Sequence, residues 1–234
     1  MYREAIKKLI EWKDSTKRKP LIVNGARQVG KTWLLKEFGK QYYEKVAYVN
    51  MDNNARMKEL FTDFNIEKLI QGLKIESGVN IEPNNTLIIL DEVQEVPNAI
   101  SSLKYFNENA NEYHIIVAGS LLGIVLHEGV SFPVGKVDFL NMYPLSFKEY
   151  LIAIGKEEFA KIIENKNEEM LKVFSEEIKR YLREYYYVGG MPEVVNDFSI
   201  NKDYNSVREI QNTILKDYEN DFSKHVPANT VEKI

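Results

Sequence analysis

The sequence LIVNGARQVGKT, Leu21 to Thr32, decides the fold of this chain. Apolar residues lead into a loop of the pattern Gly-x-x-x-x-Gly-Lys-Thr, and a helical pattern, Trp33 to Phe38, follows. A glycine loop between a buried strand and a helix presents backbone N–H groups to phosphate, the lysine adds positive charge, and the threonine hydroxyl suits a Mg²⁺ shell. The stretch therefore predicts a phosphate-binding loop in an α/β fold. A plain glycine turn between strand and helix is the alternative.

A second apolar run, Thr86 to Leu90, ends in two adjacent acids, Asp91 and Glu92. Such a continuous run suits a strand that is covered on both faces of a parallel sheet. Beside a phosphate loop, we expect Asp91 to hold the hydration shell of a metal ion. Glu92 is then placed to polarise an attacking water as general base. Read alone, the two acids are more typical of a solvated turn.

Ser120 is a third candidate, because it follows the buried run Ile115 to Ala118 after one glycine. If that strand lies between the loop strand and the acidic strand, the hydroxyl faces the terminal phosphate and the water. An N-cap for a helix over Leu121 to Leu126 is the alternative role.

The order of elements supports the same fold class. Strand and helix patterns alternate through the first 120 residues, which predicts parallel strands in an α/β fold. Val130 to Met142 is predicted as a hairpin or as a strand with an irregular approach. Ser146 and Glu149 have the spacing of a capping box, and the chain reads as helical from there. Residues 168–187 are predicted to form one amphipathic helix, which Gly189-Gly190 ends.

Composition excludes several classes of site. The chain of 234 residues has no cysteine, which excludes disulfides, thiolate zinc sites, iron–sulfur clusters and cysteine nucleophiles. Its 31 basic and 35 acidic residues give a net charge of −4, without the basic excess of a protein that grips many phosphates along DNA. The short cluster Lys17-Arg18-Lys19 is interpreted as a solvated helix end rather than a nucleic-acid patch. The sequence therefore carries no strong nucleic-acid signature.

No stretch of the chain approaches the roughly 18 consecutive apolar residues that a membrane span requires. The start, MYREAIKKLIEWKDSTKRKP, contains acids and lacks the apolar stretch of a secretory signal. We therefore expect a cytoplasmic location and no membrane contact.

Five segments together resemble AAA+-type ATPases, and more narrowly the uncharacterised prokaryotic group of predicted AAA+ superfamily ATPases. They are GARQVGKTWLLKEFG, LIILDEVQEVPN, IIVAGSLLGIVL, MYPLSFKEYL and YYYVGGMPEVV, in this order. The resemblance implies a P-loop NTPase fold, with a five-stranded parallel sheet in the order 5-1-4-3-2, flanked by helices and followed by an all-α lid. It implies an ATPase core over residues 1–144. Residues 145–234 would form the lid and the start of a further C-terminal region.

The resemblance also implies the cofactors ATP and Mg²⁺ and a role for each matching residue. Glu92, Lys31 and Ser120 would be catalytic, and Thr32 and Asp91 would serve the metal. In related ATPases a glycine-x-proline element of the lid touches the nucleotide base, and Gly190-Met191-Pro192 would be its equivalent. A helix stop and restart is the alternative for this element. The implied nucleotide-binding set is Gly25, Ala26, Arg27, Gln28, Val29, Gly30, Lys31, Thr32, Trp33 and Pro192.

One departure concerns the cation that would stabilise the transition state. Relatives often have arginine where this chain has Val134-Gly135-Lys136-Val137, and lysine lacks the bidentate geometry of arginine. Arg27, Arg180 and Arg183 are alternative cations. If the cation must come from a neighbouring copy, we expect a homo-oligomer such as a ring, or a partner protein.

The favoured hypothesis is Mg²⁺-dependent ATP hydrolysis that drives closure of the lid and passes the change to a partner domain. The alternative is a switch or scaffold that binds nucleotide and hydrolyses it slowly. A GTPase is disfavoured because Asn165-Lys166-Asn167-Glu168 has Glu in place of the usual Asp and lies between two helical patterns. A small-molecule kinase is disfavoured because no acceptor-binding arginine cluster follows the acidic strand. A nuclease is disfavoured because Glu177-Ile178-Lys179 lies on a predicted helix.

Overall fold

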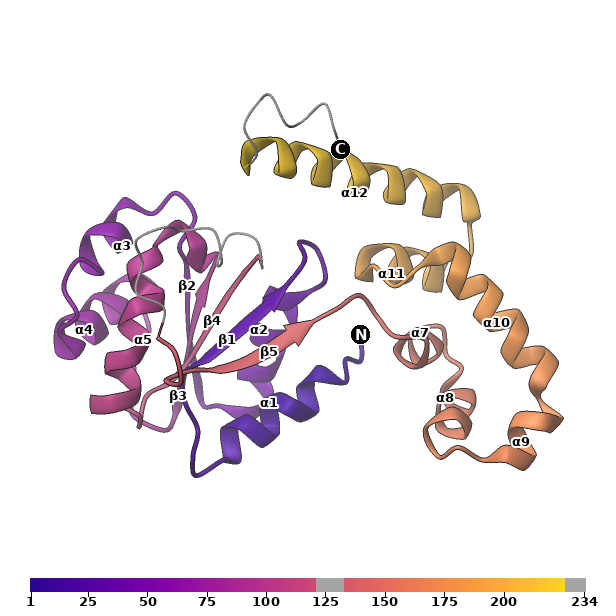
Figure 1. The fold of residues 1–234 in the computed structure, drawn as a ribbon, viewed down its shortest axis with the longest axis horizontal. Helices are drawn as coiled ribbons and strands as arrows, with labels where there is room; N and C mark the ends of the chain where they lie inside the picture. Colours follow the sequence, from indigo (N-terminus) through magenta and orange to yellow (C-terminus); the bar gives the residue numbers. More distant parts are fainter. Residues whose placement is uncertain (121–132, 226–234) are drawn as a thin grey trace. The chain divides into compact units, whose positions relative to one another are not determined.

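The computed structural model describes residues 1–120 and 133–225, and Figure 1 shows its elements. Contacts divide the chain into two compact units. One unit, called the core unit below, comprises Glu4–Ala26 and Gly30–Tyr143. The other, called the helical unit, comprises Met1–Arg3, Arg27–Val29 and Pro144–Ile234.

The core unit contains one sheet of five parallel strands in the order β2-β3-β4-β1-β5. The strands are β1 (Leu21–Gly25), β2 (Lys45–Asn50), β3 (Thr86–Asp91), β4 (His114–Ser120) and β5 (Asp138–Met142). Counted from the other edge, this is the order 5-1-4-3-2. The predicted fold class is confirmed.

Residues near the carboxyl end of β1 have neighbours on both sides. Gly25 pairs with Ser120 of β4 and with Met142 of β5. Since β5 runs parallel to β1, residues 138–142 form a strand rather than half of a hairpin, and residues 133–137 are its irregular approach. The expected helix over Leu121 to Leu126 lies outside the described residues.

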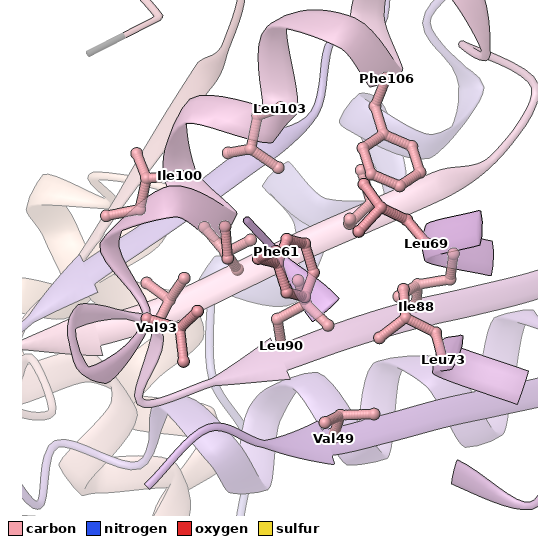
Figure 2. Close-up of a cluster of buried hydrophobic side chains, with 14 of the residues drawn as sticks. Val49, Phe61, Leu69, Leu73, Ile88, Leu90, Val93, Ile100, Leu103 and Phe106 are labelled. Carbon is pink, nitrogen blue, oxygen red and sulfur yellow. The ribbon is translucent and has the colours of Figure 1, made fainter. Parts of the chain in front are cut away.

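Helices α1 (Ala5–Asp14), α2 (Lys31–Tyr42), α3 (Ala55–Leu60), α4 (Ile66–Ser77) and α5 (Pro97–Asn109) and the short 3-10 helix η1 (Val93–Glu95) complete the described core unit. One sheet face and helices α3, α4 and α5 enclose a single apolar cluster. Figure 2 shows its centre, where Phe61, Leu69 and Phe106 lie near Ile88 and Leu90 of β3. These buried strand residues are the apolar run of the sequence.

Helix α2 covers the opposite face of the sheet at close range. A Cβ added to Gly39 of α2 would lie 2.6 Å from Val46 Cγ2 and 3.3 Å from Leu87 Cδ2. Val46 and Leu87 are register partners in β2 and β3. Gly39 therefore permits the approach that brings the start of α2 beside the strand ends.

The helical unit contains a separate apolar cluster around Leu145, Tyr150, Val195, Phe198 and Val207. Its helices are α7 (Phe147–Ala153), α8 (Glu157–Glu164), α9 (Glu168–Val173), α10 (Ser175–Val188), α11 (Pro192–Asn201) and α12 (Tyr204–His225). The capping box is confirmed, because the Ser146 hydroxyl accepts from Glu149 N–H and the Glu149 carboxylate accepts from Ser146 N–H.

The prediction of one helix over residues 168–187 is wrong. The structure has two helices, α9 and α10, with Phe174 between them at φ −102° and ψ 21°. The Phe174 ring packs edge-on against Phe159 of α8, with centroids 5.9 Å apart. This tertiary contact accompanies a break that the apolar spacing did not indicate.

In residues 1–120 and 133–225, no helix is both long enough and apolar enough to cross a membrane.

Candidate functional site

The glycine loop joins β1 to α2, as the pattern predicts. Gly30 directly precedes α2 and has φ +89°, a left-handed conformation that glycine adopts without strain. Lys31 is the first residue of the helix and is buried. Its ammonium donates to the carbonyls of Gly25 at 2.9 Å and Ala26 at 2.8 Å. The lysine therefore folds back over the start of the loop.

The loop and the acidic strand meet through one short hydrogen bond. The Thr32 hydroxyl donates to Asp91 Oδ2 at 2.6 Å. Asp91 ends β3 and is only 3% exposed, and Thr32 lies in the first turn of α2. The structure thus brings together two residues that are 59 positions apart in the chain.

Asp91 has two further donors. The Tyr48 hydroxyl donates to the same Oδ2 at 3.0 Å, and the backbone N–H of Glu92 donates to Oδ1 at 3.1 Å. Burial and the charge of Asp91 raise the pKa of Tyr48. The Lys36 ammonium lies 3.7 Å from the centroid of the Tyr48 ring. Hydrogen bonds of this kind fix the direction of the carboxylate.

Glu92 directly follows the strand in a left-handed conformation, with φ +52°. Gln94, in η1, donates from Nε2 to Glu92 Oε2 at 2.5 Å. Gln94 is buried, with 6% of its surface exposed. The second acid is therefore held by a side chain from its own turn.

Sequence reasoning missed both Tyr48 and Gln94. In the sequence, Tyr48 is one residue of a predicted strand and has no special spacing. Its hydroxyl reaches Asp91 because β2 pairs with β3, and that pairing is known only from the structure. The sequence did contain a signal for Gln94. A glutamine two residues after Glu92 is close enough in the chain to form a hydrogen bond with that carboxylate.

Ser120 is the last residue of β4, and β4 lies between β1 and β3. This is the strand order on which its predicted role depended. Its alternative role as an N-cap involves Leu121 onward, outside the described residues.

The remaining predicted binding residues from the loop and the start of α2 are divided between the two units. Arg27, Gln28 and Val29 group with the helical unit, where the Tyr218 hydroxyl donates to the Arg27 carbonyl at 2.6 Å and Gln28 Nε2 donates to Asp217 Oδ2 at 2.9 Å. Trp33 lies in the core unit and is 45% exposed.

Pro192 is the first residue of α11. The backbone conformation and the packing explain why glycine occupies the positions before it. Gly189 has φ +77°, and a Cβ on Gly190 would clash with the Leu145 carbonyl oxygen. The Leu145 N–H also donates to the Gly190 carbonyl at 2.6 Å. A helix stop and restart therefore accounts for both glycines without a nucleotide.

The donor set suits magnesium. In the part of the chain that the structure describes, no group of three or more His, Cys, Asp or Glu side chains is placed to hold a metal. Mg²⁺ typically takes one or two protein oxygens and completes its shell with water and substrate phosphates. The Thr32 hydroxyl and the Asp91 carboxylate, 2.6 Å apart, provide such a pair.

Two candidate cations have other partners. Lys136 forms an ion pair with Glu108 at 2.8 Å. The Arg180 guanidinium lies 4.8 Å from the centroid of the Tyr181 ring and donates to its hydroxyl at 3.0 Å.

In the segment compared with a guanine-reading motif, residues 165–167 lie between α8 and α9, and Glu168 begins α9. The Asn167 side chain caps α9 by accepting from Met170 N–H. The segment compared with a nuclease motif, Glu177 to Lys179, lies within α10, as predicted.

A cavity of about 690 Å³ lies elsewhere in the core unit, between the start of α4 and the turn after α5. Ile66, Gln71, Glu112 and Tyr113 contribute to its lining. None of the predicted site residues borders it.

Comparison with known proteins gives a family assignment. Residues 17–151 match the family profile described as an AAA domain, and residues 179–234 match a domain of unknown function (DUF8612). The first match covers more than half of the chain and includes the loop, the acidic pair and Ser120. A search of curated proteins gave no match.

Three solved structures are similar to this chain at low identity. Drosophila ORC bound to DNA has 14% identity and a TM-score of 0.46, over 91% of this chain and 66% of that chain. AMPPCP-bound DnaA from Aquifex aeolicus has 17% identity and a TM-score of 0.45, over 85% of this chain and 60% of that chain. Cdc6p from Pyrobaculum aerophilum has 12% identity and a TM-score of 0.40, over 67% and 48%. This chain therefore spans less than two thirds of each of them.

Proposed function

The chain belongs to the AAA domain family, and we propose that it binds ATP with Mg²⁺ and hydrolyses it at the glycine loop and the acidic pair. The observation that carries the proposal is the 2.6 Å hydrogen bond from Thr32 to Asp91. It joins a phosphate-loop residue to a strand-end acid, which is the pairing that a nucleotide-bound Mg²⁺ requires.

In this proposal the loop Gly25–Thr32 binds the phosphates. Its backbone N–H groups and the N-terminus of α2 provide positive potential. The Lys31 ammonium exchanges its two carbonyl partners, Gly25 and Ala26, for the β- and γ-phosphates. Trp33 and Pro192 belong to the proposed nucleotide contacts.

Thr32 and Asp91 would hold the metal, Thr32 through its hydroxyl and Asp91 through water. When bound, Mg²⁺ neutralises charge that builds on the β- and γ-phosphates. Tyr48 and the backbone N–H of Glu92 keep the Asp91 carboxylate in one orientation.

Glu92 would act as general base, and Ser120 would donate its hydroxyl hydrogen to the γ-phosphate or the water. The oxygen of water forms a bond to the γ-phosphorus, while the bond from that phosphorus to the β–γ bridging oxygen breaks. ADP leaves with the electron pair, and Glu92 accepts a proton from the water. The carboxyl group then returns that proton to the released phosphate.

We further propose that residues 1–144 form the ATPase core and residues 145–234 a lid whose position depends on nucleotide. Two separate apolar clusters support this division, one around Phe61 and Phe106 and one around Tyr150 and Phe198. Each part then moves without opening its own cluster. A partner domain or protein would receive the change.

A second candidate is a nucleotide switch with slow turnover. The pairing of Lys136 with Glu108 supports it, because this cation is already engaged within the core unit. A cation from another copy would then be needed for fast hydrolysis. Turnover per chain that rises with protein concentration would support the need for a second copy.

Phosphate release by wild type, Glu92→Gln and the control Glu95→Gln tests hydrolysis. Glu95 lies in the same turn and is exposed. We expect Glu92→Gln to lower kcat by about a hundredfold and to retain ATP binding, since it removes the base alone. Glu95→Gln should match wild type. Full turnover in Glu92→Gln would remove Glu92 from the mechanism.

A further inference from the structure

We propose that Gln94 orients the attacking water, with its amide nitrogen holding Glu92 and its amide oxygen accepting a hydrogen bond from the water. This inference rests on the proposed hydrolysis. It adds a residue outside the glycine loop, the acidic pair and Ser120.

The first observation is that only half of the Gln94 amide is satisfied. Nε2 donates to Glu92 Oε2 at 2.5 Å. Oε1 is buried and has no hydrogen-bond partner within residues 1–120 and 133–220. Since the residue is 94% buried, bulk solvent does not provide a hydrogen-bond donor to this oxygen.

A buried carbonyl without a partner costs about 1–3 kcal/mol, and native structures contain few of them. Because Oε1 is an acceptor, the missing group must be a donor such as water. A water that donates to Gln94 would also lie next to Glu92, since the other end of the same amide bonds the carboxylate.

The turn that contains Gln94 is held by the packing of a neighbouring apolar side chain. Val93, its neighbour, belongs to the apolar cluster between the sheet and α5, where it lies near Leu90 and Ile100 (Figure 2). Glu92 adopts φ +52°, a conformation that costs free energy for a residue with a side chain. Packing at Val93 thus holds both Glu92 and Gln94 in this unusual turn.

A second partnerless amide oxygen lies on the same sheet face. Asn24 Oδ1 is buried without a partner in the described part of the chain. Asn24 is two residues after Ile22 in β1, and Ile22 belongs to the cluster that also contains Leu90 and Val93.

Between Asn24 and η1 lies β4, whose residue beside Asn24 is Gly119. Leu90 of β3 pairs with Val117 of β4 in the last pair of these two strands, and Gly119 lies two residues beyond Val117. Glycine places no side chain there. At the strand ends, β4 therefore places no side chain beside Asn24.

This arrangement suits the two hydrogens of one water. Glu92 accepts one hydrogen and later takes it as a proton, and the Gln94 carbonyl accepts the other. A lone pair on the water oxygen then remains for the γ-phosphorus. The bonds formed and broken are those of the proposed hydrolysis, and Gln94 itself exchanges no proton.

Gln94→Met is the direct test, because methionine keeps the length of the side chain without its donor and acceptor. We expect kcat to fall about tenfold or more and the affinity for ATP, measured with a fluorescent analogue, to stay within twofold. The melting temperature should change by only a few degrees, since the lost bond to Glu92 and the removed partnerless carbonyl oppose each other. Gln71→Met, at an exposed glutamine of α4, is the matched control.

The double variant Glu92→Gln/Gln94→Met separates this role from a structural one. If Gln94 acts through Glu92 and its water, the second substitution should lower kcat far less than it does alone. An equal loss in both backgrounds, or full kcat in Gln94→Met, would overturn the role of Gln94 while leaving hydrolysis intact. Absence of turnover in wild type would overturn the proposed hydrolysis, and the role of Gln94 with it.

Discussion

A single carboxylate, Asp91, connects three elements of the candidate site. It accepts hydrogen bonds from the Thr32 hydroxyl of α2, the Tyr48 hydroxyl of β2 and the backbone N–H of Glu92. Because it is buried, each donor reduces the cost of keeping its charge. Substitutions of the residues that donate to Asp91 therefore test the role of this carboxylate without removing it.

Tyr48→Phe removes one of those donors without changing the ring that packs against Lys36. We expect the Mg²⁺ concentration for half-maximal ATP binding to rise about tenfold, because partners behind a metal-binding group typically change affinity by that order. The readout is a Mg²⁺ titration at fixed nucleotide. Tyr42→Phe, at the last residue of α2, should leave the midpoint in place. An unchanged midpoint in Tyr48→Phe would show that its hydroxyl does not serve the metal.

A second residue-scale prediction concerns pH. His114 is buried at the start of β4, and its Nδ1 lies 2.6 Å from the Tyr43 hydroxyl. Burial, assisted by the charges of Arg18 and Lys13, lowers the pKa of His114 from 6.5 to about 4. Between pH 6.5 and 4 the unfolded chain therefore binds more protons at this residue than the folded chain, and stability falls as the pH falls.

His114→Gln should make the decline in stability from pH 6.5 to 4 shallower than in wild type. Urea unfolding at several pH values measures the two slopes. Above pH 6.5 the two proteins should show the same pH dependence, because His114 is then neutral in both states. Parallel curves below pH 6.5 would contradict the assignment.

At this scale the sequence reveals residues whose chemistry is local. The loop glycines, Lys31 and the adjacent acids were predicted because backbone conformation and charge pattern are read along the chain. Tyr48 was not, since its partner is fixed by pairing between β2 and β3, which no pattern near Tyr48 encodes. The roles proposed for the predicted site residues stay predictions until they are tested.

At the scale of elements, short periodic runs bounded by turns were reliable. The strand at Thr86 to Asp91 follows the predicted run closely, because continuous apolar residues are a local signal. Residues 168–187 were mispredicted because the contact of Phe174 with Phe159 involves a different helix, α8. Spacing alone does not encode such a contact.

Gly190→Ala tests the structural explanation of the glycine-x-proline element. The new Cβ would meet the Leu145 carbonyl oxygen, which is backbone and cannot move aside cheaply. We expect a loss of about 2 kcal/mol in stability, as for overpacking elsewhere, read as a lower denaturant midpoint. Glu193→Ala, exposed in the first turn of α11, should change stability by about 0.5 kcal/mol or less. A Gly190→Ala protein as stable as wild type would show that this close approach is not required.

At the scale of the whole molecule, the order of five strands explains why distant segments meet. With β1, β4 and β3 adjacent and parallel, their carboxyl ends carry the loop, Ser120 and the acids to one edge of the sheet. Strand and helix alternation predicted a parallel sheet, whereas the order of its strands came from the family resemblance. Alternation fixes strand direction, but many orders satisfy it.

Calorimetric titration of ATP into wild type and Lys31→Ala, each with and without Mg²⁺, tests the central claim most directly. We predict that wild type binds ATP and that Mg²⁺ strengthens binding, because Thr32 and Asp91 are proposed to complete the metal shell. Lys31→Ala should lose at least about tenfold in affinity under both conditions, since a charge-assisted contact to phosphate is worth about 1.5–3 kcal/mol. Equal affinities of the two proteins, or no effect of Mg²⁺ on wild type, would contradict the account.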